Sequence, residues 1–430
     1  MRILILYNAG QTYTSTVFEH LDSFRRFSIH EWHYLHYTKF DAEHHNLSNY
    51  QAFFIHYSVR LPFDQISEST AKALSEYKGI KGLFIQDEYD NVNRTKYWLN
   101  KIVFDIVFTV VPQKNINEVY PSLEFPGTKF INNLTGYAPV ELNTILNIDT
   151  ITPPSKRNIA IGYRGRNLPI RYGELGQEKI KIGKDVKKFC KSHKIKHDIQ
   201  WDEHSRIYGQ NWYEFLLSCK AMLGSESGSN VFDWHGDLPK SIKEYKKAHP
   251  KQTEQEVYCS IIKPLERDGL MNQVSPRIFE MAASCTIMIL YEGSYSDVIQ
   301  PNVHYLPLKK DLSNLPEIFD LLNNDNFVDA MALKARSDII DSGNFGYPSF
   351  INLIDQELGK LDNSDISLLK SLNLPLNIAI TTLPIKGKSP ILSGNTSWPL
   401  RRIAIILYAL KDQIPVSTKT FIKKLIGRAY

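Results

Sequence analysis

The chain has 430 residues, of which 43% are hydrophobic and 23% are charged, and these proportions exclude an intrinsically disordered protein. The formal net charge of +5 permits an anionic ligand. The chain does not, however, carry the concentrated positive charge that is usual in nucleic-acid-binding proteins. A chain of this length exceeds what one hydrophobic core usually serves, so we expect two main domains.

The first 148 residues alternate short apolar segments with helical patterns. Helices are expected at Val17–Arg26 and Ser69–Tyr77. Strands are expected at Ile3–Tyr7, Ala52–His56, Lys81–Gln86, Ile102–Val110 and Lys129–Asn132. This order predicts a parallel sheet with right-handed crossovers. The proline-containing segment Asp149–Arg157 is expected to link the two domains.

A second strand–helix series follows the linker. Strands are expected at Asn158–Tyr163, Lys196–Trp201, Ala221–Leu223 and near His304–Leu308, and helices at Glu174–Cys190 and Tyr213–Ser218. Charged, mostly helical residues 231–273 interrupt this series as an insertion. We therefore expect an α/β protein with two Rossmann-like, doubly wound domains, 1–155 and 156–340, and a helical C-terminal extension, 341–430.

The segment Ser275–Glu292 predicts a short helix that runs straight into a buried strand. Its second half, Thr286–Leu290, is apolar without alternation, as in strands covered on both faces. The helix contains one arginine, Arg277, and one glutamate, Glu280. One interpretation is an exposed i,i+3 pair. The other is a ligand site, where the helix start favours a phosphate and Glu280 accepts hydrogen bonds from ribose hydroxyls.

Two carboxylates, Asp87 and Glu88, directly follow the strand expected at 81–86. A carboxylate at the carboxyl end of a strand can act as a general base. Their side chains point to opposite sides if the strand continues, so at most one of them can serve. A capping or salt-bridging turn is the alternative interpretation.

The sequence SPRIFEMAASCTIMILYEG resembles the donor-binding segment of group-1, family-4-like glycosyltransferases with the GT-B fold. Three further segments, GYRGRNLPIRYGELGQEKIKIG, SRIYGQNWYEFLLSCKAMLGSESGSNVFD and HYLPLKKDLSN, are similar in the same order to a bacterial branch that assembles surface polysaccharide. The resemblance covers most of residues 157–320. It implies two domains facing a cleft, with the nucleotide-sugar donor on the second and the acceptor on the first.

The resemblance also implies roles for particular residues. Arg164 and Arg166 would clamp the donor diphosphate, because a guanidinium can hold two phosphate oxygens, and Lys179 would assist. Arg277 begins the donor-binding helix, and Glu280 would hold the ribose. Asp87 or Glu88 would take a proton from the acceptor hydroxyl if the reaction inverts.

One departure from the family pattern concerns the residue eight positions before Glu280. The family places a glutamate there, and this sequence has Asn272. A similar loop, Glu226-Ser227-Gly228, instead closes an earlier strand, so the insertion would separate the two halves of the motif. Backbone N–H groups of this loop could cradle phosphate or sugar, and a simple polar turn is the alternative.

No metal or redox motif occurs. The four cysteines form no CxxC pair, and Cys219 and Cys285 are expected in the core. GT-B enzymes stabilise the departing diphosphate with basic side chains, so we expect no metal and no cofactor besides the donor. No apolar run reaches about 20 residues, so we expect no membrane-spanning helix.

The predicted function is a cytoplasmic glycosyltransferase of the hexosyl-transferring class that acts on a glycan, lipid-linked or protein acceptor. Nucleic acid is not an expected partner. Arg401–Lys411 and Lys419–Arg428 mix basic and apolar residues, which fits either a helix on the inner membrane surface or one packed on the protein. Two functions remain as alternatives: a nucleotide-sugar epimerase of the same fold, and a non-catalytic GT-B-like binding protein.

Overall fold

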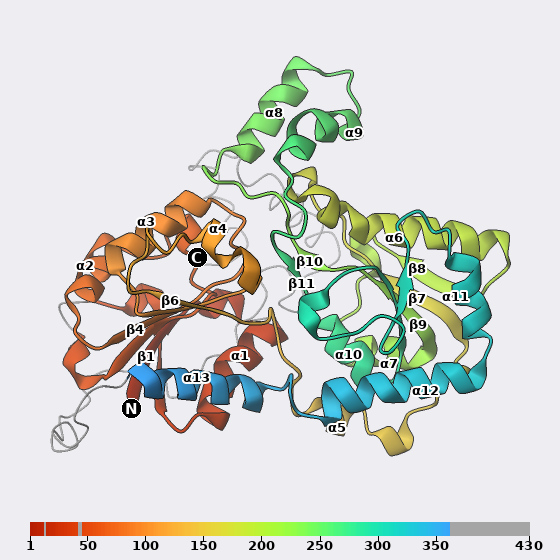
Figure 1. The fold of residues 1–430 in the computed structure, drawn as a ribbon, viewed down its shortest axis with the longest axis horizontal. Helices are drawn as coiled ribbons and strands as arrows, with labels where there is room; N and C mark the ends of the chain where they lie inside the picture. Colours follow the sequence, from red (N-terminus) through yellow and green to blue (C-terminus); the bar gives the residue numbers. More distant parts are fainter. Residues whose placement is uncertain (13, 42–44, 362–430) are drawn as a thin grey trace, which may run out of the picture.

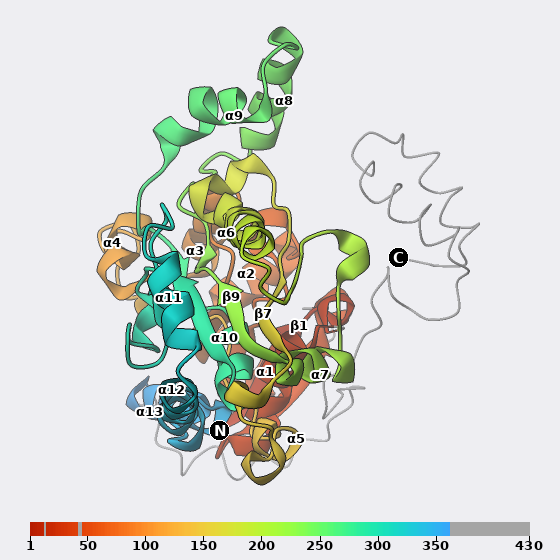
Figure 2. The same ribbon diagram turned by 90° about the vertical axis from the view of Figure 1, so that its right-hand side faces the viewer.

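The computed structural model describes residues 1–12, 14–41 and 45–361, and shows two α/β domains that lie side by side in one view (Figure 1) and one in front of the other in the view turned by 90° (Figure 2). Each contains one parallel sheet with helices on both faces, which confirms the expected pair of doubly wound domains. The basic-apolar segments predicted beyond residue 361 lie outside the described residues. In the described part of the chain, no helix combines the length and apolar character needed to cross a membrane.

The first sheet has the order β2-β1-β3-β4-β5-β6. Its strands are β1 (Arg2–Tyr7), β2 (Glu31–His36), β3 (Ala52–Ile55), β4 (Ile80–Phe84), β5 (Ile106–Thr109) and β6 (Lys129–Asn132). The connecting helices are α1 (Ser15–Phe27), α2 (Glu68–Glu76), α3 (Val92–Ile102) and the short α4 (Ile116–Val119). Alternate side chains of β1 enter different cores, Ile3 and Ile5 with α1, and Leu4 and Leu6 with α2 and α3.

Among the elements of this domain that were not expected from the sequence are β2 and α3. The strand β2 contains a buried histidine, His33, whose ring nitrogens are bonded to Tyr50 and Glu31, so its polar residues hid a buried strand. The helix α3 follows Asn91, which has a φ of 46° and makes no side-chain capping bond. Neither element therefore showed the usual strand or helix-start pattern.

The second sheet has the order β13-β12-β9-β7-β8. Its strands are β7 (Ile159–Arg164), β8 (His197–Gln200), β9 (Cys219–Gly224), β12 (Ile287–Tyr291) and β13 (Leu306–Leu308). Its helices are α6 (Gly173–Ser192), α7 (Gln210–Ser218), α10 (Arg277–Ala283), α11 (Leu315–Leu322) and α12 (Asp325–Arg336). The predicted helix-to-strand run is confirmed as α10 and β12, and Cys219 and Cys285 are buried as expected.

The insertion forms an arm that leaves and re-enters the second domain through a two-residue antiparallel ladder, β10 (Ser227–Gly228) with β11 (Asn272–Gln273). Its helices α8 (Leu238–Ala248) and α9 (Glu254–Val257) project beyond both sheets (Figure 1). The roots of the arm pack into the first domain's core through Phe232, Leu270 and Met271. The insertion therefore belongs to the cores of both domains.

Two further connections join the domains. The short helix α5 (Leu142–Ile145) follows β6 and packs in a core of the second domain. The last described helix, α13 (Tyr347–Leu361), returns to the first domain, where Phe350, Ile351 and Ile354 join the core beneath α1 (Figure 1). The chain thus crosses between the domains twice besides the arm.

The carboxyl ends of the first sheet's strands face the second domain. Val110 after β5 accepts a hydrogen bond from the Gln273 side chain, and Thr135 after β6 donates one to the Val274 carbonyl over 2.5 Å. Strand order reverses between β1 and β3 in the first sheet, and between β7 and β9 in the second. Ligands of open α/β sheets bind at such switch points, so both are candidate binding places.

Candidate active site

Four segments meet at the switch point of the second sheet. They are the loop after β7, the first turns of α6, the turn between β9 and β10, and α10. Lys179 of α6 joins two of them, because its Nζ donates to the Glu226 carbonyl at 3.1 Å and lies 3.3 Å from Ser227 Oγ. The predicted site residues Lys179, Glu226 and Ser227 are therefore in direct contact.

Three cations gather at this place. The pKa of Lys179 is lowered to about 8, mainly by burial and also by the positive charges of Arg277 and Arg166, while Glu178 and Glu226 act in the opposite direction. Among the described residues, no ion pair joins any of the three cations to a carboxylate, since Glu178 is paired with Lys310 at 2.6 Å. Such a group of unpaired cations favours an anionic ligand.

Arg277 and Glu280 do not pair with each other, so their interpretation as an exposed i,i+3 pair is wrong. Arg277 donates through Nη1 to the Arg164 carbonyl at 2.6 Å, and its guanidinium lies 5.1 Å from the centre of the Trp212 ring. The indole Nε1 of Trp212 donates to Glu280 Oε2 at 2.7 Å. Trp212 therefore stands between the two side chains and orients both.

Glu280 is half-buried at the junction with the first domain. Burial raises the pKa of its carboxyl group, while the Trp212 hydrogen bond and the charge of Arg277 lower it. Its second oxygen, Oε1, remains available for another donor. The N–H groups of Ile278 and Phe279 already bond to Ser275 and Pro276, so we assign no phosphate to the helix start itself.

Arg164 and Arg166 have different surroundings, although both were predicted to hold phosphate. Arg164 makes a two-fold contact with Asp198, with Nη1–Oδ1 at 2.9 Å and Nη2–Oδ2 at 2.7 Å, and its guanidinium stacks on Phe215. Arg166 is exposed. The Arg164 guanidinium is therefore already engaged by Asp198 and Phe215, and the exposed Arg166 stays a predicted phosphate ligand.

The turn Glu226–Gly228 is held in place by its own side chain. Glu226 Oε1 accepts from the N–H groups of Ser294 and Tyr295, at 3.1 and 2.7 Å, and Oε2 accepts from the Asn272 amide at 2.5 Å. Gly228 has a φ of 100°, and a Cβ there would lie 1.9 Å from the Met271 carbonyl oxygen, so only glycine fits. The arm thus brings Asn272 back beside the predicted loop.

The two acidic candidates of the first domain lie in unlike environments. Glu88 is buried, bonded to Thr109 and to the Val110 N–H at 3.2 Å, and burial raises its pKa to about 8. Asp87 has about half of its side chain exposed and a left-handed φ of 56°. Only Asp87 is accessible to an acceptor.

Two neighbours orient the Asp87 carboxylate. The Tyr89 hydroxyl donates to Oδ1 at 2.8 Å, and Arg60 Nη1 lies 3.5 Å from Oδ2. Arg60 also pairs with Asp90, which in turn pairs with Arg171 of the second domain at 3.4 Å. This network connects the loop after β4 to the loop after β7 across the domain junction.

Sequence reasoning missed several residues that shape the site: Arg60, Tyr89, Asp198 and Trp212. Trp212 lies within one of the segments that carry the resemblance, yet its side chain did not stand out there. Trp212 lies one residue before the helix predicted at 213–218, and only the packing of α7 against α10 shows that its indole reaches Glu280.

Sequence comparisons find no matching family model and no matching curated protein. Several solved structures resemble the chain at a distance. HepE from Anabaena in complex with UDP is 10% identical, with 84% of this chain and 100% of that chain covered and a TM-score of 0.44. An α-glucosyltransferase in complex with UDP-glucose and abasic DNA is 15% identical, covering 83% and 99%, with a TM-score of 0.45.

A third structure is the β-glucosyltransferase of phage T4, which is 12% identical, with 85% and 100% covered and a TM-score of 0.44. These likenesses are weak in both sequence and structure. We therefore base the assignment of function on the side chains of the site.

Proposed function

We propose that this protein is a glycosyltransferase that uses a nucleotide-diphosphate sugar. The observation that supports this most strongly is the group of Arg166, Lys179 and Arg277 at the switch point of the second sheet, three cations that form no ion pair with any carboxylate of residues 1–12, 14–41 and 45–361. Clustered charges of one sign raise the local concentration of an oppositely charged ligand. A nucleoside diphosphate supplies that charge, and Glu280 beside the cations offers an acceptor for ribose hydroxyls.

The proposed donor contacts follow from the positions of the side chains. Arg166, Lys179 and Arg277 bind the diphosphate, and Ser227 with the backbone of Gly228 contributes polar groups from the adjacent turn. Glu226 keeps this turn in place through its bonds to Ser294, Tyr295 and Asn272. Trp212 holds Glu280 toward the ribose.

In the proposed reaction the bond between the anomeric carbon and the phosphate oxygen breaks, and a bond from the acceptor oxygen to that carbon forms. The nucleoside diphosphate leaves with the bonding electrons, and the three cations stabilise its charge. In an inverting reaction Asp87 accepts the acceptor's proton. Glu88 is excluded from this role because it is buried against Thr109 and Val110.

The finer assignments rest on the sequence resemblance. We propose that the enzyme transfers a hexosyl unit to a glycan, lipid-linked or protein acceptor during bacterial surface polysaccharide assembly. We place it in the cytoplasm, and the two alternatives for the basic-apolar segments of residues 362–430, contact with the inner membrane face or packing on the protein, both stand, because these residues lie outside the described part of the chain.

A nucleotide screen tests the proposal. The thermal unfolding of the full chain is measured in the presence of UDP, GDP, TDP or ADP. The corresponding monophosphates and nucleosides serve as controls. We expect at least one diphosphate to stabilise the protein, by about 2.7 kcal/mol at 100 times its Kd, and its monophosphate to stabilise it less. A protein that responds to none of the diphosphates, or equally to the nucleosides, contradicts the proposal.

A further inference from the structure

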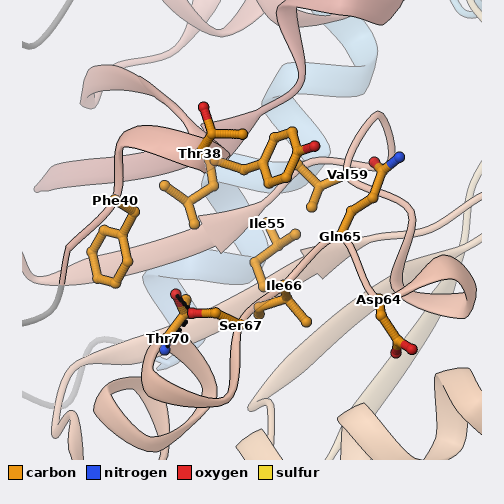
Figure 3. A pocket seen from close by; sticks show the side chains of 11 residues that line it. Thr38, Phe40, Ile55, Val59, Asp64, Gln65, Ile66, Ser67 and Thr70 are labelled. Carbon is orange, nitrogen blue, oxygen red and sulfur yellow. Dashed lines mark hydrogen bonds between the residues drawn. The ribbon is translucent and has the colours of Figure 1, made fainter. Parts of the chain in front are cut away.

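A pocket of about 260 Å³ lies at the switch point of the first sheet (Figure 3). Leu6 near the end of β1 and Ile55 at the end of β3 form its floor, and Tyr37 and Thr38, directly after β2, contribute another wall. The proposed donor site occupies the corresponding position in the second domain. The first domain therefore has its own binding place at the carboxyl ends of its strands.

The pocket has an apolar centre and an uncharged polar rim. Ile55, Val59 and Ile66 lie in its middle, and Thr38 and the Ser67–Thr70 pair lie at opposite sides of it (Figure 3). Ser67 and Thr70 bond to each other through their hydroxyl groups over 2.7 Å. Such a lining suits a ligand with an apolar face and hydroxyl groups around its edge.

The single carboxylate in the lining is neutralised from outside the pocket. Asp64 Oδ1 accepts from Arg94 at 2.6 Å and from the Trp98 indole at 2.9 Å, and its carboxylate points away from the centre (Figure 3). The pocket therefore offers neither a free positive nor a free negative charge. A phosphate or nucleotide would lose its hydration there without gaining an ionic partner.

The pocket is connected to the proposed base. Gln65, a rim residue, accepts through Oε1 from the Arg60 N–H at 3.0 Å and from the Asn8 amide at 3.2 Å. Arg60 in turn lies 3.5 Å from Asp87 Oδ2. The rim of the pocket is thus linked to Asp87 through Gln65 and Arg60.

We propose that this pocket binds one uncharged pyranose ring of the acceptor, which makes a glycan the substrate of the first domain. This inference rests on the proposed glycosyltransferase function and names its acceptor class. Complete small-molecule sites usually enclose about 300–1,000 Å³, so a pocket of about 260 Å³ fits one ring while the rest of the acceptor lies outside.

The test places a large side chain at the rim to block the pocket. Thr38 is exposed and its hydroxyl bonds only to His36 over 2.7 Å, so Thr38→Trp covers the pocket without changing the core. Thr144→Trp, on the exposed side of α5, is the matched control. Saturation-transfer NMR and calorimetry measure binding of the methyl glycosides of glucose, galactose, mannose and N-acetylglucosamine to the full chain.

A second pair of variants separates the ring of Tyr37 from its hydroxyl group. Tyr37→Ala removes the aromatic surface from the lining, and Tyr37→Phe keeps it. We expect at least one glycoside to bind the wild-type protein, and Thr38→Trp and Tyr37→Ala to weaken its affinity by about tenfold or more. Thr144→Trp and Tyr37→Phe should bind like the wild type.

Three results would overturn the inference. In the first, the wild type binds none of the glycosides. In the second, Thr38→Trp binds them as tightly as the wild type does. In the third, octanol is the one probe whose binding Thr38→Trp abolishes, which would indicate that the pocket takes an apolar tail. UDP, GDP, TDP and ADP are titrated in parallel. Nucleotide binding without glycoside binding that is sensitive to Thr38→Trp rejects the pocket and leaves the donor site intact. Glycoside binding without nucleotide binding rejects the proposed function instead.

Discussion

The two switch points of this protein differ in chemistry although their topology is alike. Between β7 and β9, Lys179 contacts a polar turn, and the charges of Arg166 and Arg277 act on it. Between β1 and β3 lies a pocket whose one carboxylate is neutralised, and its rim is linked through Gln65 and Arg60 to Asp87. The comparison teaches that one scaffold can carry two kinds of binding place. In the reaction proposed above, charge would recognise the leaving group in one domain, and shape with neutral polar groups would recognise the acceptor in the other.

The largest expected effect tests the base in the first domain. Asp87→Asn keeps the size and an acceptor for Tyr89 but cannot take a proton, so turnover should fall by about 10²–10⁴-fold in an inverting enzyme. Hydrolysis of the nucleotide sugar, with water in place of the acceptor, measures this. Nucleotide affinity should not change, because Asp87 belongs to the other domain.

Asp105→Asn is the control for this variant. The Asp105 carboxylate accepts a hydrogen bond from the Lys81 N–H at the amino ends of the strands, away from Asp87. Unchanged turnover in Asp87→Asn, or an equal loss in Asp105→Asn, would remove Asp87 from the mechanism.

The next effect tests the charge of the second switch point. Lys179→Met should weaken binding of both a nucleoside diphosphate and inorganic pyrophosphate by about 1.5–3 kcal/mol, the contribution of a hydrogen bond to a charged group. Calorimetry measures both ligands. Lys181→Met, two residues along α6 where Lys181 pairs with Asp185 in an exposed position, should bind like the wild type. Equal losses in the two variants would indicate a diffuse charge effect instead of a site.

Glu280→Ala separates nucleoside from diphosphate recognition. Loss of the carboxylate should weaken nucleoside diphosphate binding by about 1–3 kcal/mol and leave pyrophosphate binding unchanged, because only the nucleoside carries ribose hydroxyls. Competition between the two ligands gives both affinities. A variant that loses pyrophosphate binding to the same extent would show that Glu280 acts through Arg277 or Trp212 and does not contact the ligand.

The smallest effect is a difference in pH dependence. The pKa of Lys179 is lowered to about 8, so the free site loses this positive charge as the pH rises from 7 to 9, and diphosphate affinity should fall by up to about tenfold. Lys179→Arg keeps its charge over this range and should show no such fall. Glycoside binding in the uncharged pocket should not depend on pH in either protein. A parallel fall in wild type and Lys179→Arg would contradict this account.

The sequence predicted the charged switch point better than the neutral one. Arg277 and Glu280 are unusual in an apolar helix, and the family resemblance indicated Arg166 and Lys179, so all four could be named as candidates without coordinates. The pocket is lined by ordinary core residues such as Leu6 and Ile55, which look like any strand end in a sequence. Its shape arises only when three strands lie side by side.

Two outcomes that sequence reasoning could not decide have the same physical origin. Of the two interpretations of Arg277 and Glu280, the structure does not show the i,i+3 pair, because Trp212, 65 and 68 positions away along the chain, contacts both side chains. Arg164 looked as suitable as Arg166, yet Asp198 on the neighbouring strand engages its guanidinium. Both outcomes depend on contacts between distant segments, which spacing along one segment does not report.

The measurement that tests the central claim most directly is a crystal structure of the full chain with the nucleoside diphosphate that binds best. The account predicts phosphate oxygens within hydrogen-bonding distance of Lys179 Nζ and the Arg166 guanidinium, with the ribose at Glu280. A diphosphate bound at the β1–β3 pocket, or anywhere away from Lys179, would contradict it.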